Sequence, residues 1–405
     1  MVREYDIIIA GAGAAGLSLA YHLSQSSLCE LDVLLLDADP KNTNDRTWCF
    51  WSEGAPPFPE AVFHTWEKLY FQDETGRYGG QLGPLKYHMI RGLDFYRHVR
   101  SALASRSNFE FRQERIESID EKSGRAIVKT QIGAYSGRHV FNSCPLPGAL
   151  PALGRYQLLQ HFAGWWIELG KPVFSSAEGT LMDFRTAQPG DCRFFYVLPV
   201  SPSRALVEFT VFSPSRLAAE AYQSALKDYI EGQLGFSQYE VLEKEEGAIP
   251  MTDAAFKNRL SPRVHQIGTV GGAVKPTTGY AFSRIQEQAR QVVAQLEAGQ
   301  APDTRLPSQA RFAFYDQLLL DILEVEGFRG KGVFHRLFRH NRIGKVLKFL
   351  SERSNPVAEA RIFATLPVPL FLKALLRNLQ LRAGSYAAAY PSTAAAAPAT
   401  LTPKQ

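Results

Sequence analysis

A glycine-rich turn near the start of the chain constrains the fold more than any other feature. It lies between an apolar run at 4–10, which predicts a buried strand, and a helical stretch that reaches Ser24. A second apolar run at 31–36 predicts another buried strand and ends at Asp37. The turn has the pattern GxGxxG, formed by Gly11, Gly13 and Gly16. In this strand–helix–strand context the pattern predicts a dinucleotide-binding unit.

Each residue of the pattern has a physical role in such a unit. Gly11 permits the tight turn, Gly13 lets the backbone approach a pyrophosphate, and Gly16 lets the helix pack on the strand. The helix N-terminus offers amide groups to the phosphates. Asp37 can accept hydrogen bonds from the adenosine ribose. The alternative is a chance glycine turn in an ordinary strand–helix–strand unit.

A second glycine turn late in the chain favours FAD over NAD. It covers 268–272, lies at the end of a buried strand predicted over 264–270, and precedes a helix predicted over 278–297. In split flavoproteins such a late segment returns beside the first unit, and its helix N-terminus faces the flavin. Gly271 and Gly272 stand where those proteins usually carry Gly-Asp, and we count both among the predicted cofactor contacts.

These signals predict an α/β chain with a discontinuous Rossmann-like domain, a β-rich α+β lobe and a helical C-terminal segment. The FAD-binding domain is expected to combine three stretches: 1–50, 85–150 and 250–300. The substrate-binding lobe is expected to combine two: 51–84 and 151–249. Residues 305–382 are expected to be helical, basic and membrane-facing. The stretch 383–405, rich in Ala, Pro and Thr, is expected to be disordered.

The composition excludes several classes of protein. The four cysteines form no CxxC pair, and no His lies at metal-ligand spacing, so we expect reduced thiols in the cytosol and no metal site: Cys29, Cys49, Cys144 and Cys192. No apolar run approaches the ~18 residues that span a bilayer. Aromatic residues make up 12% of the chain, which suits an apolar pocket or simply a large core.

Six segments together resemble the bacterial lycopene β-cyclase family. They are NDRTWCFW (44–51), YHMIRGLD (87–94), QHFAGW (160–165), LMDF (181–184), LVEFT (206–210) and GGAVKPTTGY (271–280). Residues 312–376 also resemble the helical C-terminus of that family, and the similarity covers about 4–376. The TWxF and KPTTGY segments are the specific ones, whereas the glycine motif is shared with many flavoproteins.

The resemblance implies an isomerase that closes the linear ψ ends of lycopene into β-ionone rings without net redox change. It implies FAD that is active in its reduced form, and NAD(P)H as the reductant. Two enzyme alternatives use the same fold, an FAD-dependent hydroxylase and a geranylgeranyl-type prenyl-chain reductase. A membrane-bound flavin-binding module without catalysis is a third alternative. One-ended or two-ended cyclisation, β or ε ring type and the oligomeric state stay open.

Ring closure needs an acid, and Glu208 is the candidate. Alternation along 205–212 places it on one strand face with Leu206, Thr210 and Phe212. Burial among apolar side chains keeps a carboxyl protonated near neutral pH. A Glu on a half-wet sheet face is the alternative, and the family motif favours the acid. Asp183 could be a second acid, could orient the first, or could be a hydrogen-bonded Asp at a strand end.

Aromatic side chains could stabilise the cation that protonation creates. The candidates are Trp48, Phe50, Trp51, Trp165 and its neighbour Trp166, together with Tyr280 from the KPTTGY segment. Packing in the core is the alternative for each tryptophan and for Phe50.

The KPTTGY segment and one arginine complete the predicted cofactor contacts. Lys275, Pro276, Thr277, Thr278 and Gly279 are expected to form a flavin-facing loop, although a plain capped turn would explain the Pro and Gly equally well. Arg91 is expected to contact the flavin or a phosphate, or else to form an ion pair at the start of a helix.

The C-terminal helical segment is strongly basic. Residues 327–382 hold twelve Lys and Arg against Glu352 and Glu359, although the whole chain carries only +5. Basic and apolar residues alternate at helical spacing over 334–348, which predicts a monotopic segment on an anionic membrane surface, facing the cytoplasm. An amphipathic cap packed on the core with a solvated basic face is the alternative. No nucleic-acid-binding module is recognised, so we expect no such partner.

Overall fold

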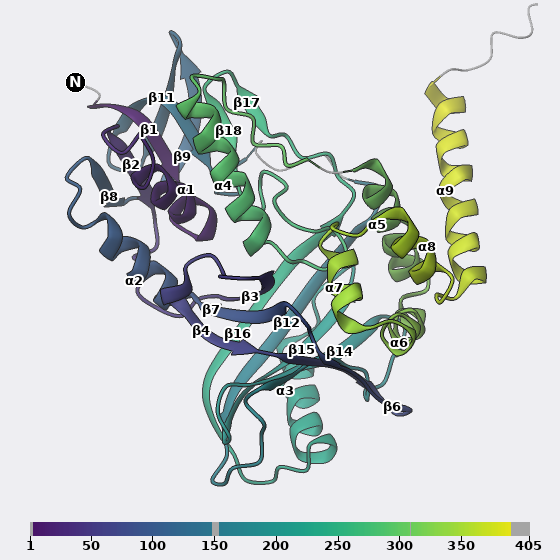
Figure 1. The fold of residues 1–405 in the computed structure, drawn as a ribbon. Coiled ribbons are helices and arrows are strands. Elements are labelled where there is room, and N and C mark those ends of the chain that lie inside the picture. Colours follow the sequence, from purple (N-terminus) through teal and green to yellow (C-terminus); the bar gives the residue numbers. More distant parts are fainter. Residues whose placement is uncertain (1–2, 148–153, 308, 390–405) are drawn as a thin grey trace, which may run out of the picture.

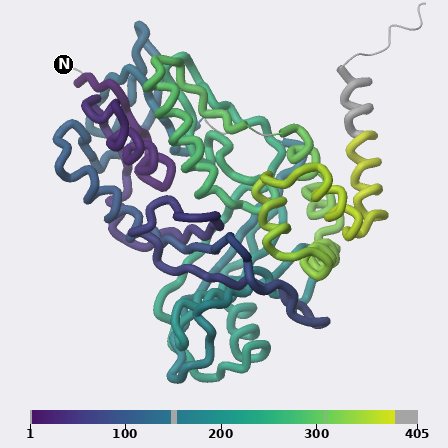
Figure 2. Tube along the Cα trace, viewed as in Figure 1, coloured from purple at the N-terminus to yellow at the C-terminus, as the bar shows by residue number. Residues whose placement is uncertain are grey.

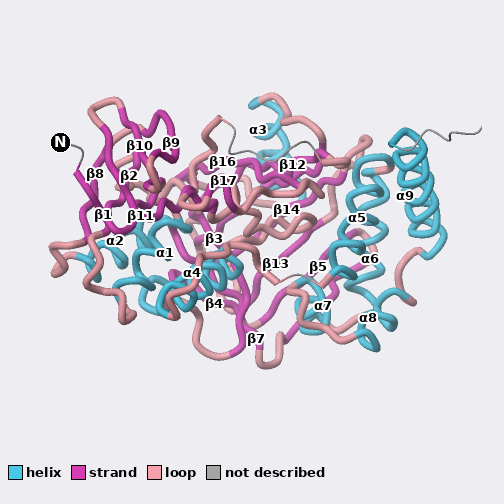
Figure 3. Tube along the Cα trace, turned by 90° about the horizontal axis from the view of Figure 1, so that it is seen from above, coloured by secondary structure: helices cyan, strands magenta, loops and turns pink. Residues whose placement is uncertain are grey.

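The computed structural model describes residues 3–147, 154–307 and 309–389. Figure 1 and the matching trace in Figure 2 show that segments far apart in the sequence form one domain, with purple and green elements side by side. A large sheet lies beside this domain. Seen from above, the C-terminal helices gather at the opposite end of the molecule (Figure 3).

The first domain is built on an eight-stranded sheet. Six strands lie in the order β17-β18-β11-β1-β2-β8, and β10 and β9 extend it from β11. Their bounds are β1 Arg3–Ala10, β2 Val33–Asp37, β8 Phe109–Gln113, β9 Ile116–Lys122, β10 Arg125–Thr130, β11 Ala134–Asn142, β17 Arg259–Ser261 and β18 Val264–Gln266. Three helices pack on this domain: α1 Ala14–Ser24, α2 Gly92–Leu103 and α4 Phe282–Glu297.

The late segment returns beside the first unit, as predicted. β18 pairs in parallel with β11, and β11 pairs in parallel with β1. The strand is shorter than predicted and ends at Gln266, because the backbone turns through 267–272. Helix α4 starts at Phe282 rather than at 278, because Gly279, with a φ of +68°, continues the loop.

The second lobe is a seven-stranded sheet in the order β16-β12-β15-β14-β13-β5-β6. Its strands are β5 Lys68–Asp73, β6 Gly76–Gln81, β12 Gln157–Glu168, β13 Glu178–Asp183, β14 Cys192–Pro199, β15 Arg204–Ser213 and β16 Glu240–Thr252. All neighbouring pairs are antiparallel except β13 with β5. One face is covered by helix α3, Ala219–Asp228, and the π-helical turn Tyr229–Gln233.

A three-stranded sheet lies between the two larger ones. Its order is β3-β7-β4, with β3 at Thr47–Glu53, β7 at Leu85–Arg91 and β4 at Val62–Trp66. A short 3-10 turn at Pro59–Ala61 precedes β4. Because β3 belongs partly to the first predicted domain and β4 to the second, this small sheet joins them.

The C-terminal segment is helical, as predicted. Its helices are α5 Ala310–Val325, α6 Gly330–His340, α7 Ile343–Leu350, α8 Pro356–Phe363 and α9 Val368–Ala389, with a 3-10 turn at Gly327–Arg329. Helix α9 continues to Ala389, so the prediction of disorder is wrong for 383–389. The remaining part of that predicted tail, 390–405, lies outside the described residues.

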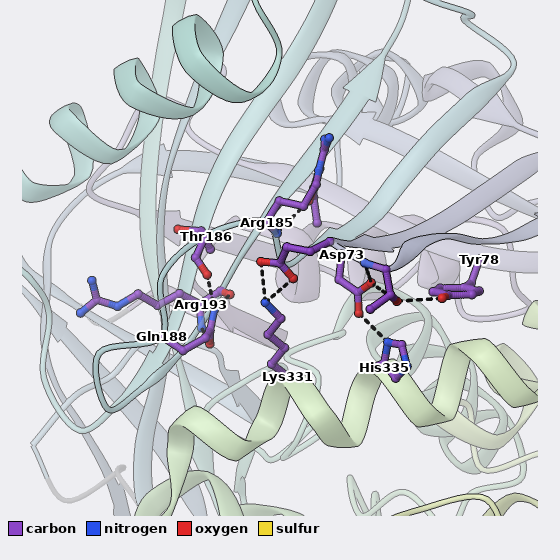
Figure 4. A network of polar contacts seen from close by, with 11 residues as sticks. Asp73, Tyr78, Arg185, Thr186, Gln188, Arg193, Lys331 and His335 are labelled. Carbon is purple, nitrogen blue, oxygen red and sulfur yellow. Dashed lines mark hydrogen bonds and ion pairs between the residues drawn. The ribbon is translucent and has the colours of Figure 1, made fainter.

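Helix α6 is fastened to the second lobe by polar contacts (Figure 4). His335 Nδ1 lies 2.5 Å from the Asp73 carboxylate, and Lys331 Nζ lies 2.6 Å from Glu74. The apolar face of α6 is buried in the core, including Phe334 and Phe338. Helix α6 is therefore amphipathic: its apolar face is packed on the core, whereas Arg336 and Arg339 are exposed.

The described residues contain no single helix that is long and apolar enough to cross a membrane. Helices α8 and α9, counted as Pro356–Phe363 and Val368–Gln380, pass that test only as a pair bent by 110°.

The close approach of α1 to the glycine turn generates a first prediction. A Cβ at Gly16 would lie 1.9 Å from the backbone oxygen of Gly11, whereas a Cβ at Gly13 meets nothing within 4 Å. We expect Gly16→Ala to lower the free energy of unfolding by about 3 kcal/mol or more, since backbone cannot yield as a side chain can. Urea unfolding of the apoprotein measures this, with Gly13→Ala as the matched control. Equal stability of the two variants would contradict the prediction.

Candidate active site

One cavity joins the first domain to the seven-stranded sheet. Its volume is about 730 Å³. At one end it is lined by the glycine turn and Asp37, and at the other by side chains of the second lobe, among them Glu208 and Glu245. A ligand at the glycine turn and one at the sheet would therefore share a single space.

The glycine turn forms an open cradle at the start of α1. Gly13 precedes the helix, and no side chain of the described chain caps it there. Gly11 has a φ of +98°, and a Cβ on it would collide with Ser143 Oγ at 2.3 Å. Asp37 accepts a hydrogen bond from the Ala12 amide at 2.7 Å and also lines the cavity. Uncapped amides, open space at Gly13 and a carboxylate opposite fit the diphosphate and ribose of a dinucleotide.

The late turn touches this cradle directly. Gly268 has a φ of +66°, and a Cβ on it would lie 2.7 Å from the Cβ of Ala15 in α1. The cavity is lined by Gly268, Thr269 and Val270 rather than by the two glycines that the sequence singled out. Those two shape the turn: a Cβ at Gly271 would lie 2.4 Å from the Gln266 oxygen, and Gly272 has a φ of +78°.

The predicted flavin-facing loop divides into two parts. Lys275 points away from the cavity: its Nζ lies 2.5 Å from Asp316 of α5 and 3.0 Å from Glu352. Thr277 donates a hydrogen bond to the same Asp316 at 2.8 Å. Neither residue lines the cavity, and nor does Pro276. The prediction of cofactor contacts at these three residues is therefore not supported, because a buried ion cluster engages the loop instead.

The second half of the loop does line the cavity. Thr278, Gly279 and Tyr280 all border it. Thr278 Oγ1 and Gln160 Oε1 are buried, and neither has a hydrogen-bond partner within the described chain. Gly279 permits the close approach, since a Cβ there would lie 2.6 Å from Gln160 Oε1. Two unpaired polar atoms on the cavity wall suit a ligand with hydrogen-bonding groups.

Glu208 lies where the alternation of β15 predicted. It borders the cavity on the face that carries Leu206 and Phe212. Thr210 donates a hydrogen bond to it at 2.8 Å. Burial, followed by the charge of Glu245, raises the pKa of Glu208 to about 8. The side chain keeps some accessible surface because it faces the cavity, but protein surrounds it on its other sides.

Sequence reasoning missed Glu245, the second carboxyl of this wall. It lies on β16, accepts a hydrogen bond from Thr47 Oγ1 at 2.6 Å, and has a raised pKa because of burial. It sits in an acidic run of β16 that is typical of a solvated strand. The only sequence signal is Gly164, a small residue in a predominantly bulky strand. That signal does not identify Glu245, because the sequence of one strand does not show which other strands pair with it.

Tyrosines surround the acid. Tyr196 lies opposite Glu208 in the pairing of β14 with β15. The hydroxyls of Tyr87 and Tyr280 are 3.0 Å apart, and Tyr280 also hydrogen bonds with Tyr196. Burial raises the pKa of all three, so their hydroxyls stay neutral. Of these residues only Tyr280 was predicted as a substrate contact.

The predicted tryptophans and Phe50 separate into different layers. Trp48 lines the cavity, and Phe50 is buried behind it, where both stack on Phe282. Trp51 supports Tyr280 edge-on, with ring centroids 4.6 Å apart. Trp165 lies on the other face of the sheet, with the α3 core, so its predicted role beside the cation is wrong.

Two further predicted residues lie outside the cavity lining. Asp183 is buried and forms an ion pair with Arg185, and Tyr229 donates a hydrogen bond to it at 2.6 Å. It is the hydrogen-bonded Asp at a strand end, not a second acid. Arg91 pairs with Glu243 at 2.5 Å and lies over the Trp166 ring. It does not contact the cofactor cradle, because this ion pair holds its guanidinium at the second lobe.

The geometry thus combines a dinucleotide cradle with a protonated carboxyl in an aromatic cavity. A family model described as "Lycopene cyclase protein" matches residues 6–376. The chain belongs to the lycopene cyclase family. This confirms the resemblance and the prediction of an isomerase-type cyclase.

Individual relatives agree with the family. The lycopene beta-cyclase of Pantoea ananas is 27% identical over 296 residues, 70% of this chain and 72% of that protein. The lycopene beta-cyclase of a Paracoccus species is 28% identical over 313 residues, 74% and 75% of the two chains. Among solved structures, HpxO of Klebsiella pneumoniae, complexed with FAD and uric acid, matches with a TM-score of 0.60 at 15% identity, over 90% of this chain and 98% of that one. This last likeness shows the flavoprotein fold.

The described residues contain no group of three His, Cys, Asp or Glu side chains that could hold a metal ion. All four cysteines are free.

The open space at Gly13 generates a second prediction. We expect Gly13→Val to fold, because its backbone φ of −82° suits any residue and no atom lies within 4 Å of its Cβ. The added methyls would occupy the pyrophosphate position, so we expect the purified variant to lack bound flavin. Absorbance of the flavin and thermal unfolding of the apoprotein measure the two effects. Wild-type flavin content in Gly13→Val would contradict the assignment of the cradle.

Proposed function

We propose that this protein is a flavin-dependent lycopene β-cyclase that converts the ψ end groups of lycopene to β-ionone rings. The observation that carries the proposal is Glu208, a carboxyl with a pKa near 8 that faces an aromatic cavity continuous with a dinucleotide cradle. Such a carboxyl carries its proton at neutral pH and can give it to an alkene. The family and its named relatives supply the substrate class.

The reaction is an acid-initiated cyclisation. The Glu208 O–H bond breaks as a C–H bond forms at the terminal double bond of the substrate, which leaves a tertiary cation. The neighbouring double bond of the substrate attacks this cation and closes the ring. A proton then leaves the ring carbon to form the ring double bond. One proton enters and one leaves, so the substrate and product have the same mass.

The chain must protect the cation from water and stabilise its charge. Trp48 and Tyr280 line the cavity, and the faces of aromatic rings attract a desolvated cation by about 2 kcal/mol each. The neutral hydroxyls of Tyr87 and Tyr196 present no nucleophilic oxyanion near it.

FAD is the cofactor we assign to the cradle. The uncapped start of α1 and the open space at Gly13 would hold its diphosphate, and Asp37 its ribose. Thr278 and Gln160 would supply hydrogen-bonding atoms further along the cavity. When reduced, the flavin would supply negative charge near a developing cation, and NAD(P)H is the proposed source of its electrons.

The hydroxylase and reductase alternatives are separated from cyclisation by product mass. Hydroxylation adds oxygen, reduction adds hydrogen, and cyclisation leaves the mass unchanged. Anaerobic incubation with lycopene in liposomes, FAD and NADPH, followed by chromatography and mass measurement, distinguishes them. A flavin-binding module without catalysis would retain FAD and leave lycopene unchanged. The same assay with oxidised FAD and no NADPH tests whether the reduced flavin is the active form. If it is, cyclisation should be slower with oxidised FAD.

Glu208 generates the third prediction. We expect Glu208→Gln to retain FAD but to lose cyclisation by at least about 100-fold, the usual contribution of a general acid. In the wild type the acid must be protonated, so we expect the rate to be full at neutral pH and to fall as the pH rises through about 8. The exposed Glu240→Gln on β16 is the control and should cyclise normally. Product formation near the wild-type rate in Glu208→Gln would refute the role.

We also propose that the C-terminal helices dock on an anionic membrane surface on its cytoplasmic side. Helix α9 exposes an apolar stripe at spacings of three and four residues, each side chain 48–59% accessible: Val368, Leu372, Leu376 and Leu379. Exposed basic side chains lie on the same segment of the chain: Arg336, Arg339, Arg342, Lys345 and Lys373. Apolar insertion with basic flanks fits an anionic bilayer, at roughly 1 kcal/mol per basic residue near the surface.

The stripe generates the fourth prediction. We expect the protein to float with vesicles that contain anionic lipid, and the double variant Leu372→Glu and Leu376→Glu to bind at least about tenfold more weakly. Because both side chains are exposed, the variant should fold normally. Ile132→Glu replaces an exposed apolar side chain of the first domain, away from this helix, and is the control. Flotation without a preference for anionic lipid, or unchanged by the double variant, would contradict the membrane surface.

A further inference from the structure

Two carboxyl side chains meet on the cavity face of the seven-stranded sheet with no side chain between them. Glu208 of β15 and Glu245 of β16 both lie opposite Gly164 of β12, the strand between them. Residues that lie opposite one another in an antiparallel sheet project to the same face. A Cβ at Gly164 would lie 3.0 Å from Leu206 Cδ1, 3.1 Å from Glu245 Cγ and 3.4 Å from Glu208 Cβ, so only glycine leaves this space open.

The hydrogen bonds around the pair differ between its two members. Glu245 accepts hydrogen bonds from the Thr47 hydroxyl at 2.6 Å and from the Trp166 indole, and the charge of Arg91 acts on it. Glu208 accepts one from the Thr210 hydroxyl and hydrogen bonds with Glu245 itself. Donors and positive charge stabilise the ionised form of a carboxyl. The negative charge therefore belongs on Glu245, and the proton on Glu208.

We propose that Glu245 is a positioning residue for the acid: as a carboxylate it holds the initiating proton on Glu208 and helps to draw a proton back onto the pair after ring closure. This inference rests on the proposed cyclisation, which it deepens. The first turnover consumes the proton of Glu208, and Glu208 alone does not explain how that proton is replaced. The proposed role of Glu245 explains the replacement.

The proton balance of the pair is closed. Before reaction it holds one proton and one negative charge. When Glu208 protonates the substrate, the pair carries two negative charges beside the substrate cation. The negatively charged pair and the cation attract each other. When the ring C–H bond breaks, its electrons form the ring double bond and its proton returns to the pair, which two adjacent carboxylates favour. No oxidant, reductant or further reactant is consumed.

Burial removes the thiol and the phenols beside the pair as alternative sources of a titration near pH 8. The groups that act on it electrostatically, or on which it acts, are Cys49, Arg91, Tyr196, Glu243 and Tyr280. Burial raises the pKa of Cys49, Tyr196 and Tyr280, so these three stay neutral near pH 8. Arg91 and Glu243 form an ion pair with each other. A titration seen near pH 8 is therefore that of the pair.

The test measures both the proton and the rate. In infrared difference spectra of the flavin-loaded protein, wild type minus Glu208→Gln, we expect a protonated-carboxyl band that disappears as the pH rises through about 8. Glu245→Gln removes the like charge, so we expect the band and the alkaline limb of the rate profile to move down by more than about one pH unit. We also expect kcat to fall at least about tenfold with KM for lycopene unchanged.

Two variants keep the test decisive. Glu246→Gln changes the adjacent, exposed residue of β16 and should leave both profiles in place. Gly164→Ala inserts a methyl between the carboxyls and should move both profiles in the same direction as Glu245→Gln does. It therefore tests the inference independently if Glu245→Gln does not fold. Profiles of Glu245→Gln or Gly164→Ala that superimpose on the wild type would overturn the inference.

Failure of the proposed function gives a different result. If the wild type forms no cyclic product but its infrared band titrates near pH 8 and moves in Glu245→Gln, the carboxyl pair stands and cyclisation does not. If the wild type cyclises lycopene and the band does not respond to Glu245→Gln, cyclisation stands and the role of Glu245 is refuted.

Discussion

The parallel pairing of β18 with β11 is the contact on which the rest of the molecule depends. After β11 the chain builds five of the seven strands of the large sheet, β12 to β16, and then returns to the nucleotide domain at β17 and β18. The return sets Gly268 against Ala15 and carries the following loop to the boundary between domain and sheet. Closing so long a loop costs conformational entropy, which the buried core of the domain must offset. The returning segment therefore supplies part of the wall of the cavity that joins the cradle to the acid.

Local patterns were enough for the parts of the structure whose geometry is local. Helix α1 ends at Ser24, as predicted. The two faces of β15 were correctly divided, because alternation along a strand does not depend on its partners. The glycine pattern likewise located the cradle, since Gly11 and Gly16 answer steric requirements of one short turn and Gly13 leaves open space beside it. The family resemblance then supplied the chemistry, which no local pattern contained.

The features that the sequence did not reveal are set by contacts between distant strands. Glu245 meets Glu208 only because β12 lies between their strands in a particular register. Adjacent residues of a strand point to opposite faces, so only one of Trp165 and Trp166 can lie on the cavity face of the sheet. The same strand register places Trp166 on that face. Lys275 does not lie at the predicted cofactor site, because its ionic partners come from the C-terminal helical region. A single sequence does not encode such pairings in any pattern that can be read along one segment.

The buried ion cluster around Lys275 also has a consequence for how such proteins can be recombined. It ties the loop that carries Thr278 and Tyr280 to Asp316 of α5 and to Glu352 just after α7. A buried lysine separated from its carboxylates is strongly unfavourable. The residues of the loop and of these helices must therefore be compatible with one another, although they lie apart in the sequence. Chimeras between relatives would have to exchange both together, and a crossover placed at the linker before α5 would divide a charge-matched set.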